Sequence, residues 1–423
     1  MKIYHGNILY SAKLGELTAL PQGYVAVEED GRIRGTYPRL PEELKGCPVE
    51  ELGEGLLIPA FQDLHLHAAQ LPTAGLGYDG DAGEWFNGYT YPAEQRYSTD
   101  PDHAGKVNRE LIHALWENGI MSSVIMCATG AGATRDLMER LMESGLGAYV
   151  GKMNSDHAAF GEAQESLEES RRRTEELIGW ARGRSEGVQY ILSPEFVPAV
   201  SEELLEYLGR RAKEEDLPVQ SHMSEGEGDL AMVRDRFPQE KLYGYVWDRY
   251  GLFGQTPTVM AHCSYVTEEE LELMARRGVY IAFCPNALQH IPGDRFLPLR
   301  RALDLGVPVG LGSDIGGGHT LNMLQNMASA IQVSKTLCPG RGLSAAEAFY
   351  LATKGGGGFF GAVGSFEPGY RFDALVLDDL SLAGGWEDTL EERLQRLIYR
   401  GDSRHILRRF RAGREIPAPE PLS

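Results

Sequence analysis

The sequence predicts an α/β protein: a (β/α)8 TIM-like barrel with a small β-sandwich domain built from both termini. Eight short apolar runs alternate with segments of helical spacing, and metal-type side chains stand where several runs end. Alternating residues near both termini indicate the small β domain. The expected division is 58–365 for the barrel, with 1–57 and 366–423 as the two parts of the small domain.

The eight apolar runs are the expected barrel strands. They cover residues 56–67, 122–128, 148–154, 188–196, 218–225, 258–264, 279–286 and 308–314. Short runs of this kind, rich in apolar residues, are typical of buried parallel strands. In a barrel of this kind the carboxyl ends of the strands carry the chemistry.

Segments between the runs have the spacing of amphipathic helices. Leu, Met and Ala recur at i, i+3, i+4 and i+7 in 109–119, 133–145, 201–216 and 267–278. Ser201 and Thr267 precede acidic residues, which is typical of helix N-caps. Strands that alternate with such helices favour a parallel sheet closed into a barrel.

The chain ends have a different pattern. Residues 24–33 alternate around Asp30-Gly31, which predicts a β-hairpin, and residues 373–378 predict a further strand. The two segments flank the barrel in sequence. We therefore expect them to meet in one small β domain.

Composition excludes several classes of partner. The 423 residues carry a net charge of −20, which would repel nucleic acid and anionic membranes. No apolar run approaches the ~18 residues that a transmembrane helix needs, and the N-terminus lacks the apolar stretch of a secretory signal. Five scattered cysteines favour free thiols in the cytoplasm.

Five metal-type residues stand at the ends of four predicted strands. His65 and His67 end the first run, and two residues apart in a strand they point to the same face. His222, His262 and Asp314 lie at the ends of later runs. Neutral imidazoles and a carboxylate suit Zn²⁺, with Fe²⁺ or another divalent ion as the alternative. A bound ion of this kind lowers the pKa of its water toward ~7.

Glu225 is the candidate proton shuttle. It lies three residues after His222, so it can reach the same end of the barrel and act as a general acid and base. The alternative is a solvated loop glutamate. The motifs His-Glu-x-x-His, Pro-Cys-x-x-Cys and Gly-x-Ser-x-Gly are missing, which argues against zincin proteases, small cytidine-type deaminases and serine hydrolases.

From about residue 50 to 412 the chain resembles the amidohydrolase superfamily and, within it, the guanine deaminase branch. The first motif is Pro59-Ala60-Phe61-Gln62-Asp63-Leu64-His65-Leu66-His67, and similar stretches are 68–70, 74–76, 84–94, 220–225, 260–262, 284–286, 312–314 and 397–402. The stretch from Trp85 to Glu94 is specific to the guanine deaminase branch.

The resemblance implies one zinc ion per chain with His65, His67, His222 and Asp314 as ligands. Binuclear relatives carry a lysine at the end of the fourth strand, and residues 191–196 contain none. His262 would hydrogen-bond the attacking water or the tetrahedral centre. Glu225 would move a proton to a ring nitrogen and then to the departing amine. Glu225, His262 and Asp314 are therefore the candidate catalytic residues.

The candidate substrate contacts are Gln70, Trp85 and Glu195. Gln70 matches the family glutamine that contacts the purine, and Trp85 belongs to aromatics that either cover the ring or pack in the core or a dimer. Glu195 stands where the guanine deaminases have an arginine, so an acceptor replaces a donor. His290 and His319 follow the last two strands, where each either contacts substrate or lies at the surface.

These features predict a hydrolytic deaminase of an amino-substituted nitrogen heterocycle, first of all guanine to xanthine and ammonia. Because of Glu195, a diaminopurine, aminotriazine or pterin stays open as the substrate. Amide or chloride hydrolysis on the same scaffold is a second class, and a non-catalytic scaffold a third. By analogy with the superfamily we expect a homodimer, with neither nucleic-acid nor membrane partners.

Overall fold

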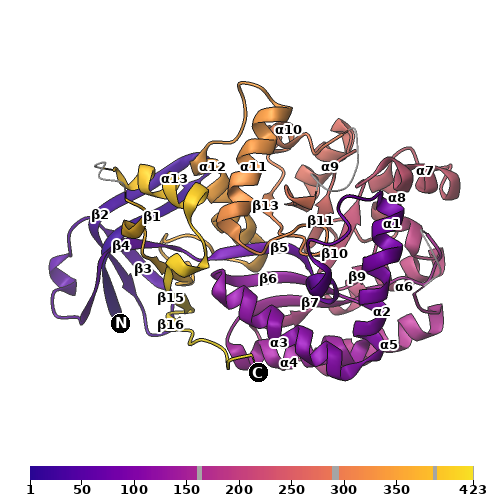
Figure 1. Ribbon diagram of the computed structural model, residues 1–423, viewed down its shortest axis with the longest axis horizontal. Coiled ribbons are helices and arrows are strands. Elements are labelled where there is room, and N and C mark those ends of the chain that lie inside the picture. The colour runs from indigo at the N-terminus through magenta and orange to yellow at the C-terminus, as the bar shows by residue number, and fades with distance from the viewer. Residues whose placement is uncertain (160–163, 288–294, 384–387, 423) are drawn as a thin grey trace.

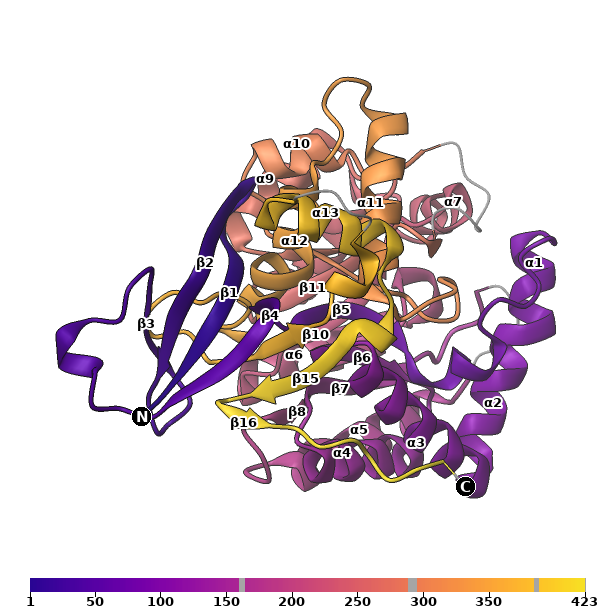
Figure 2. The same ribbon diagram turned by 60° about the vertical axis from the view of Figure 1, so that its left-hand side comes forward.

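The computed structural model describes residues 1–159, 164–287, 295–383 and 388–422. A central set of parallel strands is surrounded by helices, and a twisted sheet lies to one side (Figure 1). This side sheet contains both the indigo N-terminal strands and the yellow C-terminal strands, as Figure 2 also shows. Segments far apart in sequence therefore build it together.

Each of the eight predicted runs contains a strand. They are β5 (Phe61–His67), β6 (Ile120–Cys127), β7 (Gly147–Asn154), β8 (Val188–Tyr190), β10 (Val219–Met223), β11 (Thr258–His262), β12 (Tyr280–Phe283) and β13 (Val309–Leu311). The fourth run breaks after Tyr190 and continues as β9 (Ser193–Pro194). The first run is divided too, because its opening residues belong to β4 (Val49–Pro59) of the side sheet.

The central strands form two parallel sheets that meet at both edges. One holds β5 to β8 and the other β10 to β13. Leu192 pairs with Val219 at one junction. At the other, the Asp314 N–H donates to the His65 carbonyl over 2.8 Å. These bonds close the eight strand positions into a ring, and the predicted α/β class with parallel strands is confirmed.

Helices follow the strands in the predicted alternation. They are α3 (Pro101–Glu117), α4 (Ala131–Ser144), α5 (Leu167–Ala181), α6 (Glu202–Glu215), α7 (Glu227–Arg236), α8 (Tyr243–Arg249), α9 (Glu268–Arg277), α10 (Leu299–Asp304) and α11 (Met323–Leu337). Ser201 and Thr267 are N-caps, as predicted, since each side chain accepts a backbone N–H of the first turn. Gly278 ends α9 at a φ of 68°, where a side chain would be strained.

A long segment leads from β5 to α3. It comprises η2 (Ala68–Thr73), α1 (Ala82–Trp85), the π-helical η3 (Phe86–Thr90) and α2 (Tyr91–Thr99). In Figure 2, α1 and α2 stand at the right-hand edge. The Tyr78 hydroxyl donates to the Gly316 carbonyl over 2.7 Å. That bond ties the segment to the loop after β13, close to Asp314.

The strands of both chain ends form one seven-stranded sheet. Its order is β16 (Arg414–Glu415), β15 (Ile406–Arg411), β14 (Ala374–Leu377), β4, β1 (Lys2–Lys13), β2 (Glu16–Val27) and β3 (Ile33–Tyr37). The predicted hairpin around Asp30-Gly31 joins β2 to β3. A second sheet facing this one, which a sandwich requires, is not found within the described ranges.

Aromatic rings and two helices cover the side sheet. Tyr4 stacks on Phe372 with ring centroids 4.8 Å apart, and Phe410 meets Tyr4 edge-on at 5.3 Å. The helices α12 (Ala345–Tyr350) and α13 (Leu390–Arg400) contact β1 and β2. Of the helices that the structure describes, none has the length and apolar character to cross a membrane.

Candidate active site

Four strand ends bring the predicted metal-type residues together. His65 and His67 belong to β5, His222 to β10 and His262 to β11, and Asp314 follows β13. The two β5 histidines point to one side because they are two residues apart in a strand. All five residues thus face a common space at the carboxyl ends of the strands.

The ligand atoms of these residues are close enough to share an ion. His67 Nε2 lies 3.1 Å from His222 Nε2, and Asp314 Oδ1 lies 3.3 Å from His65 Nε2 and 3.5 Å from His67 Nε2. Two overlapping groups, His65-His67-His222 and His65-His262-Asp314, each keep their ligand atoms within 4.8 Å of one another. His65 Nε2 is buried without a hydrogen-bond partner in this structure. Buried nitrogen donors left unpaired around a carboxylate fit a divalent ion.

Burial keeps the imidazoles neutral. It lowers the pKa of His222 to about 4, helped by the nearby His262, and holds the pKa values of His65 and His67 well below the usual range. Burial also raises the pKa of Asp314, although His262 and His222 oppose the shift. Neutral imidazole is the form that binds a metal, so binding requires no loss of protons from the histidines.

Hydrogen bonds to two residues, Asp63 and Glu195, orient the cluster, and neither set of contacts was predicted from the sequence. Asp63 Oδ1 accepts the Ser313 N–H over 2.9 Å and the His65 N–H over 3.2 Å, which links β5 to the loop before Asp314. His222 Nδ1 lies 2.6 Å from the backbone carbonyl of Glu195, so Nε2 faces the other histidines. Such supporting contacts fix ring orientation around metals. Asp63 lies two residues before His65 on the same strand face, and this spacing was the available clue.

The backbone is strained where these strands end. His262, Cys263, Asp314 and Ser224 have φ values of 67°, 56°, 49° and 51°, in the left-handed region that disfavours ordinary side chains. Strain of this kind persists where surrounding contacts enforce it, and it concentrates at functional sites.

Glu225 lies beside His262, with Oε1 3.4 Å from Nε2. Asp229 holds its loop by accepting the backbone N–H groups of Glu225 and Gly226, each over 3.1 Å. Burial and the charge of Asp314 raise the pKa of Glu225 to about 8. A carboxyl group that titrates near neutrality can both take and give a proton. Asp229 was not singled out in the sequence, because its role depends on how the loop folds.

Polar groups of the predicted substrate side surround the cluster. Gln70 Nε2 donates to Glu94 Oε1 over 2.9 Å, and Gln70 packs against Gly316, where an added Cβ would lie 2.2 Å from Gln70 Oε1. Burial raises the pKa of Glu195 to about 7, opposed by a hydrogen bond from Ser155. Burial and the Glu195 charge raise the pKa of Glu94 to about 8. This side of the site is rich in acceptors.

Three further residues were predicted as possible substrate contacts: Trp85, His290 and His319. Trp85 is half-exposed at the end of α1, and its ring meets Phe86 edge-on at 4.9 Å. His319 is exposed in the loop after β13, and His290 lies outside the described residues.

With this geometry in place, comparison with known proteins identifies the family. The model of the amidohydrolase family matches residues 56–415. The chain belongs to this family. It is 31% identical to the guanine deaminase of Homo sapiens, over 98% of this chain and 96% of the human protein. The guanine deaminase of Escherichia coli is 32% identical, over 92% and 89% of the two chains.

Solved structures of amidohydrolases have the same fold. A crystal structure of guanine deaminase from C. acetobutylicum, with guanine bound in its active site, superimposes with a TM-score of 0.91 at 40% identity. The match covers 98% of this chain and 99% of that one. The resemblance inferred from the motifs is thereby confirmed. Family membership and the His/Asp cluster together support a divalent metal.

Proposed function

We propose that this amidohydrolase deaminates guanine hydrolytically, so that guanine and water give xanthine and ammonia. One observation carries the proposal: Glu225 stands 3.4 Å from His262, beside a cluster fitted for a metal. A proton-transfer group and a metal at one strand-end site are the parts that hydrolytic deamination needs. The guanine deaminases at 31% and 40% identity support guanine as the ring.

We propose that His65, His67, His222 and Asp314 hold one zinc ion, with Fe²⁺ or another divalent ion as the alternative. Neutral nitrogen donors with one carboxylate favour zinc among the common ions. When bound, such an ion lowers the pKa of a water molecule toward ~7 and so supplies the nucleophile.

The proposed roles of the chain's own groups follow from their positions. Glu225 takes the proton of the nucleophile and delivers it to the ring nitrogen beside the reacting carbon. It then takes the remaining hydroxyl proton of the tetrahedral centre and gives it to the departing amine, which leaves as ammonia while the new carbonyl forms. His262, whose Nε2 lies 3.4 Å from Glu225 Oε1, hydrogen-bonds the oxygen of the tetrahedral centre. Asp314 is close to His65 and His262, and it offers its second oxygen to the same region.

Gln70, Glu195 and Trp85 are the proposed substrate contacts, and Glu195 favours a second candidate substrate. An ionised carboxylate only accepts hydrogen bonds, so it favours a ring with an amine or N–H where guanine carries its carbonyl. A diaminopurine fits this pattern, as do aminotriazines and pterins.

We also propose a cytoplasmic homodimer. Five cysteines without disulfides in this structure support a reducing compartment. Light scattering at several concentrations tests the dimer, and a mass of one chain throughout would exclude it.

Ammonia release from zinc-loaded protein tests the activity. The panel is guanine, 2,6-diaminopurine, a pterin, an aminotriazine, an amide and a chlorotriazine, with products identified by absorbance and mass. We expect ammonia and xanthine from guanine. Chloride release without ammonia, or no turnover of any ring by metal-loaded protein, would overturn the proposal.

A further inference from the structure

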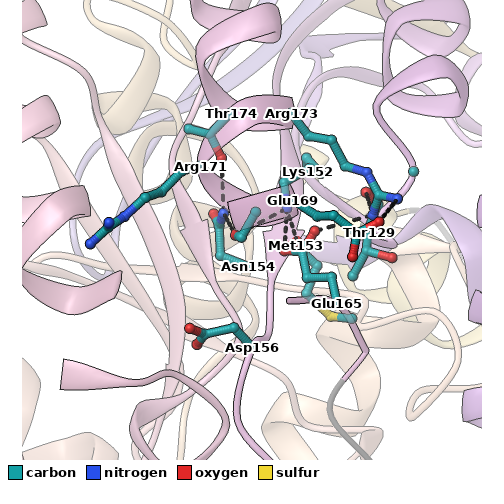
Figure 3. Close-up of polar contacts among 12 residues, drawn as sticks. Thr129, Lys152, Met153, Asn154, Asp156, Glu165, Glu169, Arg171, Arg173 and Thr174 are labelled. Carbon is teal, nitrogen blue, oxygen red and sulfur yellow. Dashed lines mark hydrogen bonds and ion pairs between the residues drawn. The ribbon is translucent and has the colours of Figure 1, made fainter. Parts of the chain in front are cut away.

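A buried polar network lies behind the carboxyl end of β7, and the mechanism above does not use it. We call it the β7 network; its members are Lys152, Asn154, Glu165, Ser170, Arg173 and Thr174. Figure 3 shows the side chains of Lys152, Asn154, Glu165, Arg173 and Thr174 gathered in one place. Lys152 and Glu165 form an ion pair, and both side chains are fully buried.

Each charge of this pair has further partners. The Lys152 ammonium also donates to the Met153 carbonyl over 2.8 Å. Glu165 Oε2 lies 3.3 Å from the Arg173 guanidinium. Burying an ion pair costs desolvation that its attraction often fails to repay, so stability alone is a weak reason for this pair. Fixing one local conformation is a better reason, and the neighbouring backbone shows which conformation is fixed.

The network anchors the loop after β7. Asn154 Nδ2 donates to the hydroxyls of Ser170 and Thr174 over 2.8 and 3.0 Å, which ties the strand end to α5. The Glu165 N–H donates to the Ser155 carbonyl over 3.2 Å. Asn154 and Ser155 are thus held from the side chain and from the backbone.

The first of these anchored residues holds the Glu195 backbone directly. The Glu195 N–H donates to the Asn154 carbonyl over 3.1 Å. The Ser155 side chain opposes the effect of burial on the pKa of the Glu195 carboxyl group, which places it beside that group. The position of Glu195 therefore depends on the loop that the network fixes.

A second set of bonds fastens the rest of the segment 195–201. Asp156 accepts the Ser201 N–H over 2.7 Å and the Ser201 hydroxyl over 2.5 Å. The His157 N–H donates to the Ala199 carbonyl over 3.0 Å. Hydrogen bonds therefore join the loop after β7 to the segment 195–201 at several positions.

We propose that the Lys152–Glu165 ion pair is a positioning device for Glu195, acting through Asn154 to hold Glu195 in place at the substrate side of the site. Lys152 and Glu165 touch no reacting atom in this scheme and are positioning residues. The structural part of the proposal stands on the contacts above. Its effect on substrate rests on the proposed deaminase function.

Hydrogen exchange tests the structural part without any substrate. In Glu165→Ala, the amides of Glu195 and Ser201 should exchange about tenfold faster or more, because their acceptors lose the anchored loop. Glu165→Gln keeps an oxygen for Lys152 and should stay within about threefold of wild type. Glu176→Ala removes an exposed carboxylate from α5, the helix that follows Glu165, and is the matched control.

Unchanged exchange at both amides in Glu165→Ala would overturn the proposal. If Glu165→Ala fails to fold, Lys152→Met replaces it, because Glu165 then keeps its Arg173 partner. The same two amides should exchange faster in Lys152→Met than in Glu176→Ala, and equal rates would again overturn the proposal.

Kinetics on guanine and 2,6-diaminopurine test the second part. We expect Glu165→Ala to raise KM for 2,6-diaminopurine about tenfold and KM for guanine much less, with kcat and zinc content nearly unchanged. In a Glu195→Ala background the same substitution should change KM less than about twofold, since coupled residues are not additive. Equal changes in KM in the wild-type and Glu195→Ala backgrounds would mean that the network stabilises the fold without positioning Glu195, and would overturn the proposal. If wild-type protein turns over no ring, the proposed function fails while the exchange experiment still decides the positioning claim.

Discussion

The strand ends of the barrel and the side sheet are both well buried, but the strand ends bury ionisable side chains and the side sheet buries aromatic rings. At the strand ends, His65, His67, His262 and Asp314 are buried next to one another, and His65 Nε2 and His262 Nδ1 lack hydrogen-bond partners. In the side sheet, the corresponding space is filled by aromatic rings that stack or meet edge-on. The first arrangement is costly without a ligand, and the second is stable by itself.

Charged groups make the same contrast. The side sheet pairs its charges, as in the Arg408–Glu415 contact of 2.7 Å between β15 and β16. Around the strand ends, burial together with neighbouring carboxyl groups raises the pKa values of Glu225 and of Glu94, on α2, to about 8. Unfavourable electrostatics kept in one region and avoided in the other point to selection for function at the strand ends. Substitutions in the two regions should therefore separate activity from stability.

The largest separation is expected from Asp314→Ala or His65→Ala. Each removes a proposed ligand, so the purified variant should lose its divalent ion and all measurable turnover. The fold should survive, because neither side chain belongs to the aromatic core. Mass spectrometry measures the metal content, and circular dichroism checks that the fold is retained. A variant that keeps one ion per chain and wild-type turnover would remove that residue from the ligand set.

Phe372→Ala should give the converse result. It removes a fully buried ring from the stack with Tyr4, and such changes cost about 3–5 kcal/mol of unfolding free energy. Denaturant unfolding measures this loss. Turnover per folded molecule and metal content should stay at the wild-type level. A drop in turnover with unchanged stability would mean that the two regions are not separable.

Glu225→Gln should leave stability and metal content intact while slowing turnover. An amide cannot carry the proton, and general acid–base catalysis is typically worth ~10²–10⁴-fold, so kcat should fall by ~10² or more. Single-turnover kinetics on guanine measure the chemical step. If the rate stays near wild type with the ion retained, the raised pKa of Glu225 has no catalytic role.

The strand ends could be predicted from the sequence because a local pattern marks them. Each metal-type residue has a local pattern that indicates its place, either the His-x-His pair at 65–67 or an apolar run before His222, His262 or Asp314. The contacts that hold these residues carry little evidence, since the spacing of Asp63 and His65 was the one clue and Asp63 meets Ser313 from 250 positions away. The Lys152–Glu165 pair was missed for a similar reason: a buried and an exposed lysine look alike in a sequence.

The side sheet was predicted only in outline, for a related reason. Alternation marks a strand and a face but not its neighbour. The antiparallel pairing of β4 with β14, which joins the two chain ends into one sheet, depends on tertiary packing. The break between β8 and β9 was also missed, because residues 188–196 were interpreted as one mainly apolar run although Ser193 and Pro194 interrupt it.

Glu195→Arg is the mildest change and tests the strand ends themselves. The Glu195 backbone is held by Asn154, so a side chain at this position faces the proposed substrate from a fixed place. Above its raised pKa of about 7, the Glu195 carboxylate accepts hydrogen bonds and would meet a ring carbonyl unfavourably, whereas an arginine would donate to it. We expect the wild type to favour 2,6-diaminopurine over guanine in kcat/KM. In the variant, that ratio should shift toward guanine by roughly tenfold or more, since sites built to pair a polar group discriminate strongly. Glu195→Gln, which offers both a donor and an acceptor, should fall between the two. A wild type that deaminates guanine far faster than diaminopurine, with a ranking that Glu195→Ala leaves unchanged, would transfer the choice of ring to another residue such as Gln70.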